Sequence, residues 1–272
     1  MNMHTLWKKV VGCIEPLVAD GYLYLPLDFG VASIDITKDL TNPDNWTLTQ
    51  APSALLTKSW FTEASGKSLN ASGTLLCQEG NMVKGRDGAI YVLYRMETQP
   101  NGGYAGMLKL SDDRTKLELL PSGGSLIELP TTVTMFRIKF DPISNRYICI
   151  SNWYMTDNAC RARNVLGISY SDDLTEWVMV DTLLVDRQII NSECSCWKTA
   201  FQYVDWDYDG DDIVMTVREA TGFTNTFHDG KYFTFYRISN FRDQFGFEFK
   251  KLEYKEASDG DTLNYADGTP LT

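Results

Sequence analysis

Four similar units repeat along the chain, and this repeat restricts the fold more than any other feature of the sequence. Each unit contains a strand, a tight turn, a strongly apolar second strand, a loop, a third strand and a polar turn before a fourth strand. The second strands begin 67, 57 and 67 residues apart. They are Tyr22–Leu27, Ala89–Arg95, Arg146–Asn152 and Ile213–Arg218. Short strands bounded by turn signals, with almost no helical periodicity, predict an all-β chain.

Repeated four-stranded units of this length are typical of the blades of a β-propeller. We therefore predict an all-β fold, a β-propeller of four-stranded blades with four units visible, in a single domain over residues 1–272. The spacing exceeds the ~40–50 residues of compact blades, which leaves room for long loops. Residues 51–75 and 183–200 do not fit a strand pattern and are predicted to be loops between blades. A β-sandwich with a similar number of strands is the alternative fold.

The fourth unit contains the clearest hairpin. Phe201–Trp206 is aromatic and β-branched, and Ile213–Val217 is β-branched and apolar. Asp209-Gly210 supplies the turn between them, because glycine tolerates positive φ and aspartate can bond its own backbone. The acidic stretch 205–212 lacks the ligand order of a calcium loop, so it is interpreted as a plain turn. The unit is predicted to close over residues 238–245.

Composition narrows the possible partners. The net charge is −11, with 25 basic against 36 acidic residues, which argues against nucleic acid and anionic membrane surfaces. No stretch reaches the ~18 apolar residues of a membrane span. The first residues are charged and no apolar region follows them, so no signal peptide is predicted and the localisation is left open. Aromatic residues make up 12% of the chain; they fill cores and also form platforms that stack on sugar rings.

Six cysteines are present, and their spacing does not indicate a metal or redox site. Cys194 and Cys196 form the one close pair, which lacks the C-x-x-C spacing, and His4 and His228 are the chain's two histidines. Reduced, mostly buried thiols are expected, while disulfides stay possible. No metal and no cofactor are predicted, since phosphate-binding glycine loops and nucleophile-elbow motifs are absent from the sequence.

Polar residues gather where the first strand of a unit begins and the second strand ends. In a propeller these two points open on the same face, so they are expected to line a central pocket. The residues predicted on this face are Glu79, Arg95, Asn152, Gln202 and Arg218, with Asn225, His228, Asp229, Lys231 and Tyr232 in the loop that follows. Hydrogen bonds and ion pairs between blades, with Glu79 or Asp205 as the acidic partner, are the alternative explanation.

The same residues carry a resemblance to a known family. FQYVDWDYDGDDIVMTVRE and the loop to KYFTFYRISNFRD resemble the C-terminal part of bacterial sialidase-like propeller proteins of the exo-sialidase superfamily. QEGNMVKGRDGAIYVLYRME, FDPISNRYICISN and RNVLGISYSDDLTEW are similar to the same family. The resemblance covers about residues 15–245. The turn SDDLTEW resembles a degenerate Asp-box, a structural element of the blade periphery, so Asp172 and Trp177 are not site candidates.

This resemblance implies a six-bladed fold and a set of roles. Sialidases use an arginine triad for a carboxylate, a tyrosine–glutamate nucleophile pair and an aspartate acid. By resemblance Arg95, Arg163 and Arg218 bind an anion or hydroxyls, because a planar guanidinium forms two parallel hydrogen bonds to a carboxylate. Tyr232 would be the counterpart of the nucleophile. The N-terminal Arg-Ile-Pro motif and its aspartate have no match, since Arg137-Ile138-Lys139 lacks the proline and lies in a predicted strand. By this resemblance the chain is expected to be a truncated or divergent version, from a family commonly secreted or periplasmic.

The candidate catalytic residues are chosen by the needs of glycoside hydrolysis. That reaction usually uses two carboxylates, ~5–5.5 Å apart for retention of configuration and ~6.5–9.5 Å for inversion. Glu79 and Asp205 both begin units, and we predict them as the pair. His228 is placed to protonate a leaving group or bind a sugar hydroxyl. The alternatives are an ion pair of Glu79 with Arg95, a structural bond of Asp205 to backbone or an arginine, and a solvated loop histidine.

These observations favour a carbohydrate-active protein, an exo-acting glycoside hydrolase of the sialidase-like type that takes a glycan or oligosaccharide. Two alternatives stay open. One is a glycan-binding propeller that kept the pocket and lost the chemistry. The other is a five-bladed arabinanase-like glycosidase, which predicts a triad of carboxylates rather than a cluster of arginines. The sugar, the linkage and the oligomeric state do not follow from the sequence.

Overall fold

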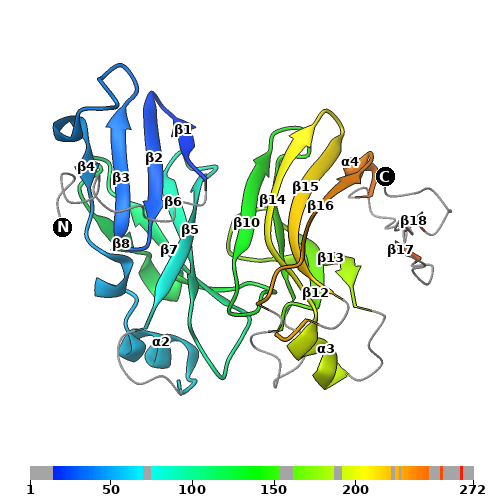
Figure 1. The fold of residues 1–272 in the computed structure, drawn as a ribbon. Helices are drawn as coiled ribbons and strands as arrows, with labels where there is room; N and C mark the ends of the chain where they lie inside the picture. Colours follow the sequence, from blue (N-terminus) through cyan, green and yellow to red (C-terminus); the bar gives the residue numbers. More distant parts are fainter. Residues whose placement is uncertain are drawn as a thin grey trace. The chain divides into compact units, whose positions relative to one another are not determined.

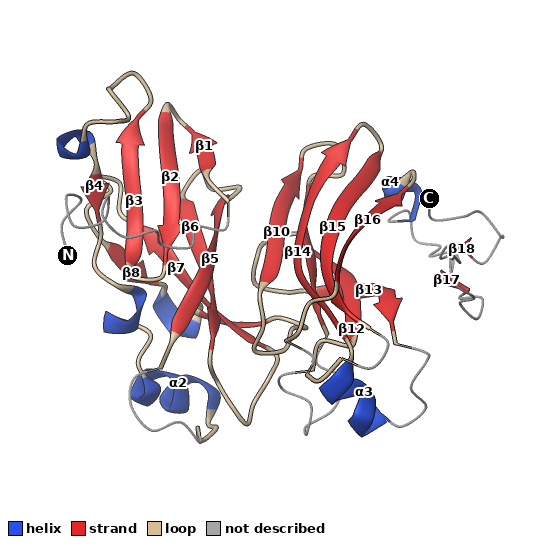
Figure 2. Cartoon of the chain, in the orientation of Figure 1, coloured by secondary structure: helices blue, strands red, loops and turns tan. Residues whose placement is uncertain are grey.

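The computed structural model describes residues 15–69, 75–153, 162–186, 192–221, 224–226, 228–244, 252–253 and 264–265. Strands dominate this part of the chain, as Figure 2 shows in red. They form five antiparallel sheets, and in the four larger ones consecutive strands are neighbours, which is the topology of propeller blades. The predicted all-β fold class with blade-type sheets is confirmed.

The chain divides into two compact units. Unit 1 comprises Met1–Leu129 and Asp173–Glu176, and unit 2 comprises Pro130–Asp172 and Trp177–Thr272. Each unit contains two of the four larger sheets, and each is described by itself below. The prediction of a single domain over residues 1–272 stays a prediction.

Unit 1 contains sheets 1 and 2 (Figure 1). Sheet 1 has the order β1-β2-β3-β4, with β1 Leu17–Ala19, β2 Tyr22–Leu27, β3 Gly30–Asp35 and β4 Thr47–Leu48. Sheet 2 has the order β5-β6-β7-β8, with β5 Cys77–Lys84, β6 Ile90–Met96, β7 Tyr104–Leu110 and β8 Leu117–Leu119; β9, Leu126–Glu128, also pairs with β7.

Unit 2 contains sheets 3 and 4. Sheet 3 has the order β10-β11-β12-β13, with β10 Phe136–Asp141, β11 Arg146–Asn152, β12 Val165–Ser171 and β13 Val178–Val185. Sheet 4 has the order β14-β15-β16, with β14 Ala200–Asp209, β15 Asp212–Ala220 and β16 Tyr232–Ile238. A small two-stranded sheet pairs β17, Leu252–Glu253, with β18, Asn264–Tyr265.

The repeat found in the sequence matches the sheets closely. The predicted second strands correspond to β2, β6, β11 and β15, and β2 and β11 have the predicted bounds. Asp20 and Gly21 both have positive φ, of 51° and 77°, as the tight turn between β1 and β2 requires. The acidic turn after β14 is a plain turn as well, because Asp209 and Asp212 pair with Arg237.

Short helices lie where the sequence predicted loops or strand closure. They are α2 (Lys58–Ser65), α3 (Ser192–Lys198), α4 (Phe241–Gln244) and the 3₁₀ turns Pro43–Asn45, Pro52–Ala54 and Pro121–Gly123. The prediction that residues 51–75 form only a loop is wrong, since Thr57 accepts a bond from the amide of Trp60 and Gly66 ends α2 with φ 69°. The loop predicted over 183–200 is wrong at both ends, because β13 reaches Val185 and α3 follows.

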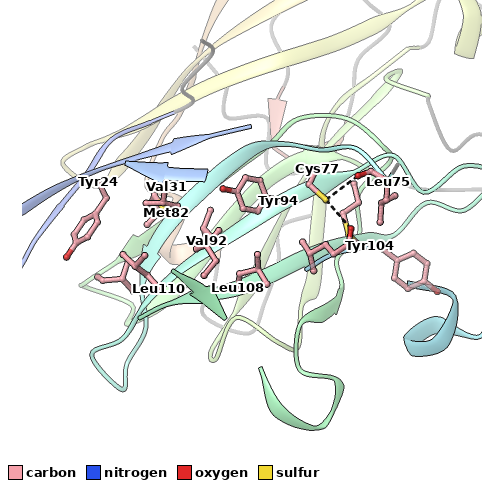
Figure 3. Packing of buried hydrophobic residues seen from close by; sticks show 14 of the residues in the cluster. Tyr24, Val31, Leu75, Cys77, Met82, Val92, Tyr94, Tyr104, Leu108 and Leu110 are labelled. Atoms are coloured by element: carbon pink, nitrogen blue, oxygen red, sulfur yellow. Dashed lines mark hydrogen bonds between the residues drawn. The ribbon is translucent and has the colours of Figure 1, made fainter. Parts of the chain in front are cut away.

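Each unit has its own hydrophobic core. In unit 1, Met82, Val92 and Leu108 lie opposite one another across β5, β6 and β7, so their side chains share one face of sheet 2. They pack with residues of sheet 1 such as Tyr24 and Val31 (Figure 3). In unit 2 the core joins sheets 3 and 4 and contains Ile148, Ile150, Leu166, Ile168, Leu183, Leu184, Phe201, Val204, Trp206, Ile213, Met215, Val217, Ile238 and Phe241.

The structure describes the side chains of three cysteines, and all three are free thiols. Cys77 and Cys149 are buried, and Cys196 is half-buried. Burial raises the pKa of both Cys77 and Cys149 to about 12, so these thiols stay protonated and unreactive at neutral pH. Cys13, Cys160 and the side chain of Cys194 lie outside the described part of the chain.

Candidate functional site

Sheets 2 and 4 carry the same irregularity at the start of their first strands. The register of β5 against β6 shifts between Gln78 and Asn81, and that of β14 against β15 shifts between Gln202 and Asp205. Such a shift is a β-bulge, which bends the strand and redirects a side chain. It sits at corresponding places, because Gln78 pairs with Arg95 and Gln202 pairs with Arg218.

One residue within each bulge adopts a left-handed backbone conformation. Glu79 has φ 53° and Tyr203 has φ 52°. This conformation costs about 1–2 kcal/mol for a residue with a Cβ, so the surrounding structure must hold it in place. At Glu79 the backbone amide donates a hydrogen bond to Asp28 Oδ1 at 2.9 Å, which helps to keep the residue in this conformation. Glu79 therefore corresponds to Tyr203 in the repeat, and Asp205, the predicted partner of Glu79, lies two residues further along the chain.

In unit 1 the bulge brings two carboxylates onto one arginine. Arg95 donates from Nη1 to Glu79 Oε2 at 2.7 Å and from Nη2 to Glu97 Oε1. Gln99 donates to the other oxygen of Glu97 at 2.9 Å. The side chains of Arg95, Glu79 and Glu97 are 11%, 22% and 16% exposed, so the group is partly shielded yet open to a ligand.

The charge of Arg95 is maintained by its two partners. Burial acts to lower the pKa of the guanidinium, but the attraction and hydrogen bonds of Glu79 and Glu97 outweigh burial and hold this pKa above its ordinary value. Because two acids surround one cation, the cluster as a whole is negative. The predicted ion pair of Glu79 with Arg95 is thus present, and Arg95 orients carboxylates of the protein itself.

In unit 2 the corresponding bulge brings cations around an aromatic ring. The guanidinium carbons of Arg218 and Arg163 lie over the ring of Tyr203, 4.9 and 5.4 Å from its centroid. The ring of His228 meets that of Tyr203 edge-on at 6.4 Å. Arg218 Nη2 also donates to the backbone oxygen of His228 and lies 3.3 Å from its Nδ1. Arg163 donates to Gln202, which is buried.

Asp205 lies three residues beyond the paired glutamine, outside this cluster. Its Oδ1 accepts from Nη2 and Nε of the buried Arg137 at 2.6 and 3.2 Å. The side chain of Asp205 is 63% exposed, whereas that of Arg137 is 5% exposed. Asp205 therefore neutralises a buried cation, which is the structural alternative weighed in the sequence analysis. Its role as a catalytic carboxylate stays a prediction.

Asn152 and Tyr232 lie in contrasting surroundings. Asn152 is buried, and its side-chain nitrogen lies within bonding distance of the backbone oxygens of Phe201, Arg163 and Val165 at 2.7, 3.2 and 3.3 Å. These bonds tie β11 to β14 and β12. Tyr232 begins β16 and is 53% exposed, with the amine of Lys231 5.9 Å from its ring centroid. The substrate-binding role of Asn152 and the nucleophile role of Tyr232 stay predictions.

Three residues of these clusters were missed by reasoning from sequence. Glu97 stands two residues after Arg95, so strand alternation indicated that both share a face. Asp28 directly follows the second strand of the first unit. Only the residues at the ends of these strands were considered as candidates, and the first of these strands ends at Leu27. Tyr203 gave no signal, because a bulge depends on the pairing of two strands and does not appear in the spacing of one.

Metal chemistry finds no support within the part of the chain that the structure describes. No group of three or more histidine, cysteine, aspartate or glutamate side chains there is placed to hold a metal ion.

No helix among the described residues is long and apolar enough to cross a membrane.

Comparisons with known proteins give matches by structure alone. No family model matches the sequence, and no curated protein sequence matches it. The solved structures that match include an α-L-arabinofuranosidase from Clostridium thermocellum, with 12% identity, a TM-score of 0.46 and coverage of 77% of this chain and 61% of that one. An exo-β-1,3-galactanase from Phanerochaete chrysosporium has 10% identity, a TM-score of 0.49 and coverage of 85% and 47%.

A further match is an exo-1,5-α-L-arabinanase from a bovine ruminal metagenomic library, with 11% identity, a TM-score of 0.44 and coverage of 82% and 72%. The chain spans 61% of the arabinofuranosidase and less than half of the Phanerochaete galactanase. These matched structures are glycoside hydrolases. Similarity this distant does not define a family for the chain, so its chemistry rests on its own residues.

Proposed function

We propose that the protein is a carbohydrate-active hydrolase, an exo-acting glycoside hydrolase of the sialidase-like type that the sequence resemblance implies. The observation that carries the proposal is the bulge that sets Glu79 beside Arg95 and Glu97. Two carboxylates close to one another are what most glycoside hydrolases use to break a glycosidic bond. A strained residue in such a place is more common at functional sites than elsewhere.

The roles follow from the needs of the reaction. One carboxyl group gives its proton to the oxygen of the leaving sugar, and the other carboxylate takes a proton from water or attacks the anomeric carbon. In this proposal Glu79 is the acid or base, and Glu97 takes the place that the sequence analysis gave to Asp205. Arg95 holds both carboxylates in position, and Gln99 orients Glu97 through its second oxygen.

The cluster of unit 2 is proposed, by itself, as a binding site for a glycan. Arg163 and Arg218 are the anion- or hydroxyl-binding arginines. His228 adds a polar side chain that can form a hydrogen bond with a sugar hydroxyl. Gln202 holds Arg163 rather than the ligand.

Two other functions each have one observation in their favour. A glycan-binding protein without activity is favoured by the bond of Asp205 to Arg137, which removes a predicted catalytic carboxylate. An arabinanase-like glycosidase is favoured by the three carboxylates Asp28, Glu79 and Glu97 in unit 1. The sialidase-like type is favoured by the arginine cluster of unit 2.

A substrate panel distinguishes these functions. The purified protein is incubated with sialosides, aryl glycosides, arabinofuranosides and β-1,3-galactosides, and released sugar is measured; a glycan array is probed in parallel. Turnover of sialosides or other acidic glycosides supports the main proposal, and turnover of arabinofuranosides supports the arabinanase-like alternative. Array binding without any turnover supports the binding protein. Neither turnover nor binding on any glycan rejects all three.

A further inference from the structure

We propose that Tyr203 is a positioning residue, whose ring holds the guanidinium groups of Arg163 and Arg218 together as one binding pair for the carboxylate of an acidic sugar. This inference rests on the recognition role proposed for unit 2, and it adds a residue that the sequence analysis did not consider. Tyr203 acts through the two arginines, so it need not touch the ligand.

The backbone conformation of Tyr203 supports this role. Tyr203 lies in a bulge with φ 52°, the conformation that glycine, asparagine and aspartate adopt most readily. A tyrosine held there costs about 1–2 kcal/mol of backbone strain. The matching residue of sheet 2, Glu79, bears the same strain and points its carboxylate at Arg95. The same bulge in both sheets therefore presents a side chain to an arginine.

The placement of the charges gives the second argument. Two guanidinium groups near one another repel, and this repulsion must be offset if both are to face one ligand. The face of an aromatic ring carries negative charge and attracts cations within about 6 Å of its centroid. Both guanidinium carbons meet this condition over Tyr203, at 4.9 and 5.4 Å. One ring thus offsets part of the repulsion and fixes both groups.

Other contacts restrain the backbone of Arg163 and the side chain of Arg218. The amide of Phe201 donates to the backbone oxygen of Arg163 at 2.7 Å, which fixes Arg163 to the start of β14. Gly230 lies against Arg218 so closely that an added Cβ would come within 2.7 Å of Nε. The edge of the His228 ring faces Tyr203. The charged ends are bonded to Gln202 and to the backbone oxygen of His228, and the ring of Tyr203 is the one group among these contacts that lies against both.

The test is a binding measurement that does not depend on turnover. Sodium D-glucuronate is titrated into the full-length protein, with D-glucose as the uncharged comparison, and the Nε–H signals of arginine are followed by NMR. Wild type and Tyr203→Phe, which keeps the ring, are expected to bind glucuronate with dissociation constants within about twofold of each other. Tyr203→Leu, which removes the ring, is expected to bind about tenfold more weakly and to shift the Arg163 and Arg218 signals.

Two further variants make the outcome decisive. Tyr170→Leu is the matched control, since Arg146 lies 4.3 Å over Tyr170 in the same unit but outside the cluster, and it is expected to bind like wild type. If Tyr203→Leu does not fold, Tyr203→Asn replaces it, because asparagine tolerates positive φ.

Unchanged binding in the ring-deleted variant overturns the proposal. Equal loss in Tyr203→Phe overturns it too, because the hydroxyl and not the ring would then matter. Binding of glucuronate no better than glucose in wild type also overturns it. A protein that binds glucuronate through Tyr203 but hydrolyses no glycan would leave this inference standing and reject the proposed hydrolase.

Discussion

At the scale of single residues, the bulges of sheets 2 and 4 carry different side chains. Sheet 2 has Glu79 there and forms an acidic cluster around Arg95. Sheet 4 has Tyr203 there and forms a cluster of two arginines and a histidine. The backbone device is the same, so the difference between the clusters arises from the side chains.

A buried carboxyl group next to the cluster of unit 2 gives a prediction about pH. Burial raises the pKa of Glu219 above its ordinary value of 4.5, although Tyr236 donates a hydrogen bond to it. A raised pKa in the folded state means that the contribution of Glu219 to stability is fully present below pH 4.5 and is lost as the pH rises through the folded value. Glutamine mimics the protonated form at every pH.

Glu219→Gln is therefore expected to gain stability relative to wild type as the pH increases from 4.5 to 7.5. Urea denaturation of both proteins at several pH values across this range measures the difference. A difference in unfolding free energy that stays constant or falls with pH would show that burial does not raise the pKa of this carboxyl group.

At the scale of elements, close packing of β12 on an aromatic ring should make one glycine irreplaceable. A Cβ on Gly167 would lie 2.1 Å from the ring of Trp153, which is itself buried. Overpacking of this kind costs about 1–3 kcal/mol, so Gly167→Ala is expected to lower the unfolding free energy by about 2 kcal/mol or more. Chemical denaturation checks this. Gly124→Ala, where the nearest atom would be 3.3 Å away, is the control and should change stability far less.

The short helix α4 is fastened to sheet 3 by a buried ion pair. Arg242 donates from Nε and Nη2 to the fully buried Asp141 at 3.0 Å. Removing one partner of such a pair leaves an uncompensated charge, so Arg242→Ala is expected to cost about 3 kcal/mol. Arg237→Ala breaks the more exposed pairs with Asp209 and Asp212 and is expected to cost about 1 kcal/mol or less. Equal losses in thermal or urea denaturation would contradict this account of α4.

Strands could be predicted from the sequence better than the features that interrupt them. Tyr22–Leu27 and Arg146–Asn152 were recovered to the residue, because apolar runs between turn residues are local signals. The helix Lys58–Ser65 was missed although Thr57 and Gly66 mark its ends, since eight residues show little periodicity. The segment predicted to close the fourth unit contains the helix α4. Arg242 of this helix pairs with Asp141, which lies 101 residues away in sequence, and no local signal predicts such a contact.

The candidate site, like the fold, was predicted from the sequence only in part. Glu79 and Arg95 were found as polar residues at strand ends, and the structure places them in contact. Asp205 was predicted as the partner of Glu79 because both begin units. The bulges decide which residue of each strand faces the arginine, and they arise from the pairing of strands rather than from any single stretch of sequence.

At the scale of the whole molecule, the connection between the two units bears on the predicted single domain. Leu129–Met135 joins β9 to β10, and five of these seven residues are buried. Flexible linkers between domains are exposed, whereas most of this segment is buried. We therefore expect one cooperative transition in differential scanning calorimetry. Two separable transitions, each with its own midpoint, would show that the units unfold as separate domains.

We propose that this chain hydrolyses glycosides with Glu79 at the reacting bond. The most direct test is kcat/KM of Glu79→Gln on the best substrate of the panel, compared with wild type and with Glu118→Gln. Glu118 is an exposed carboxylate of the same unit that pairs with Lys116 outside the cluster, so it serves as the matched control. A loss on the order of 10²–10⁴-fold in Glu79→Gln, with Glu118→Gln unchanged, is the predicted result. Undiminished turnover in Glu79→Gln would contradict the claim.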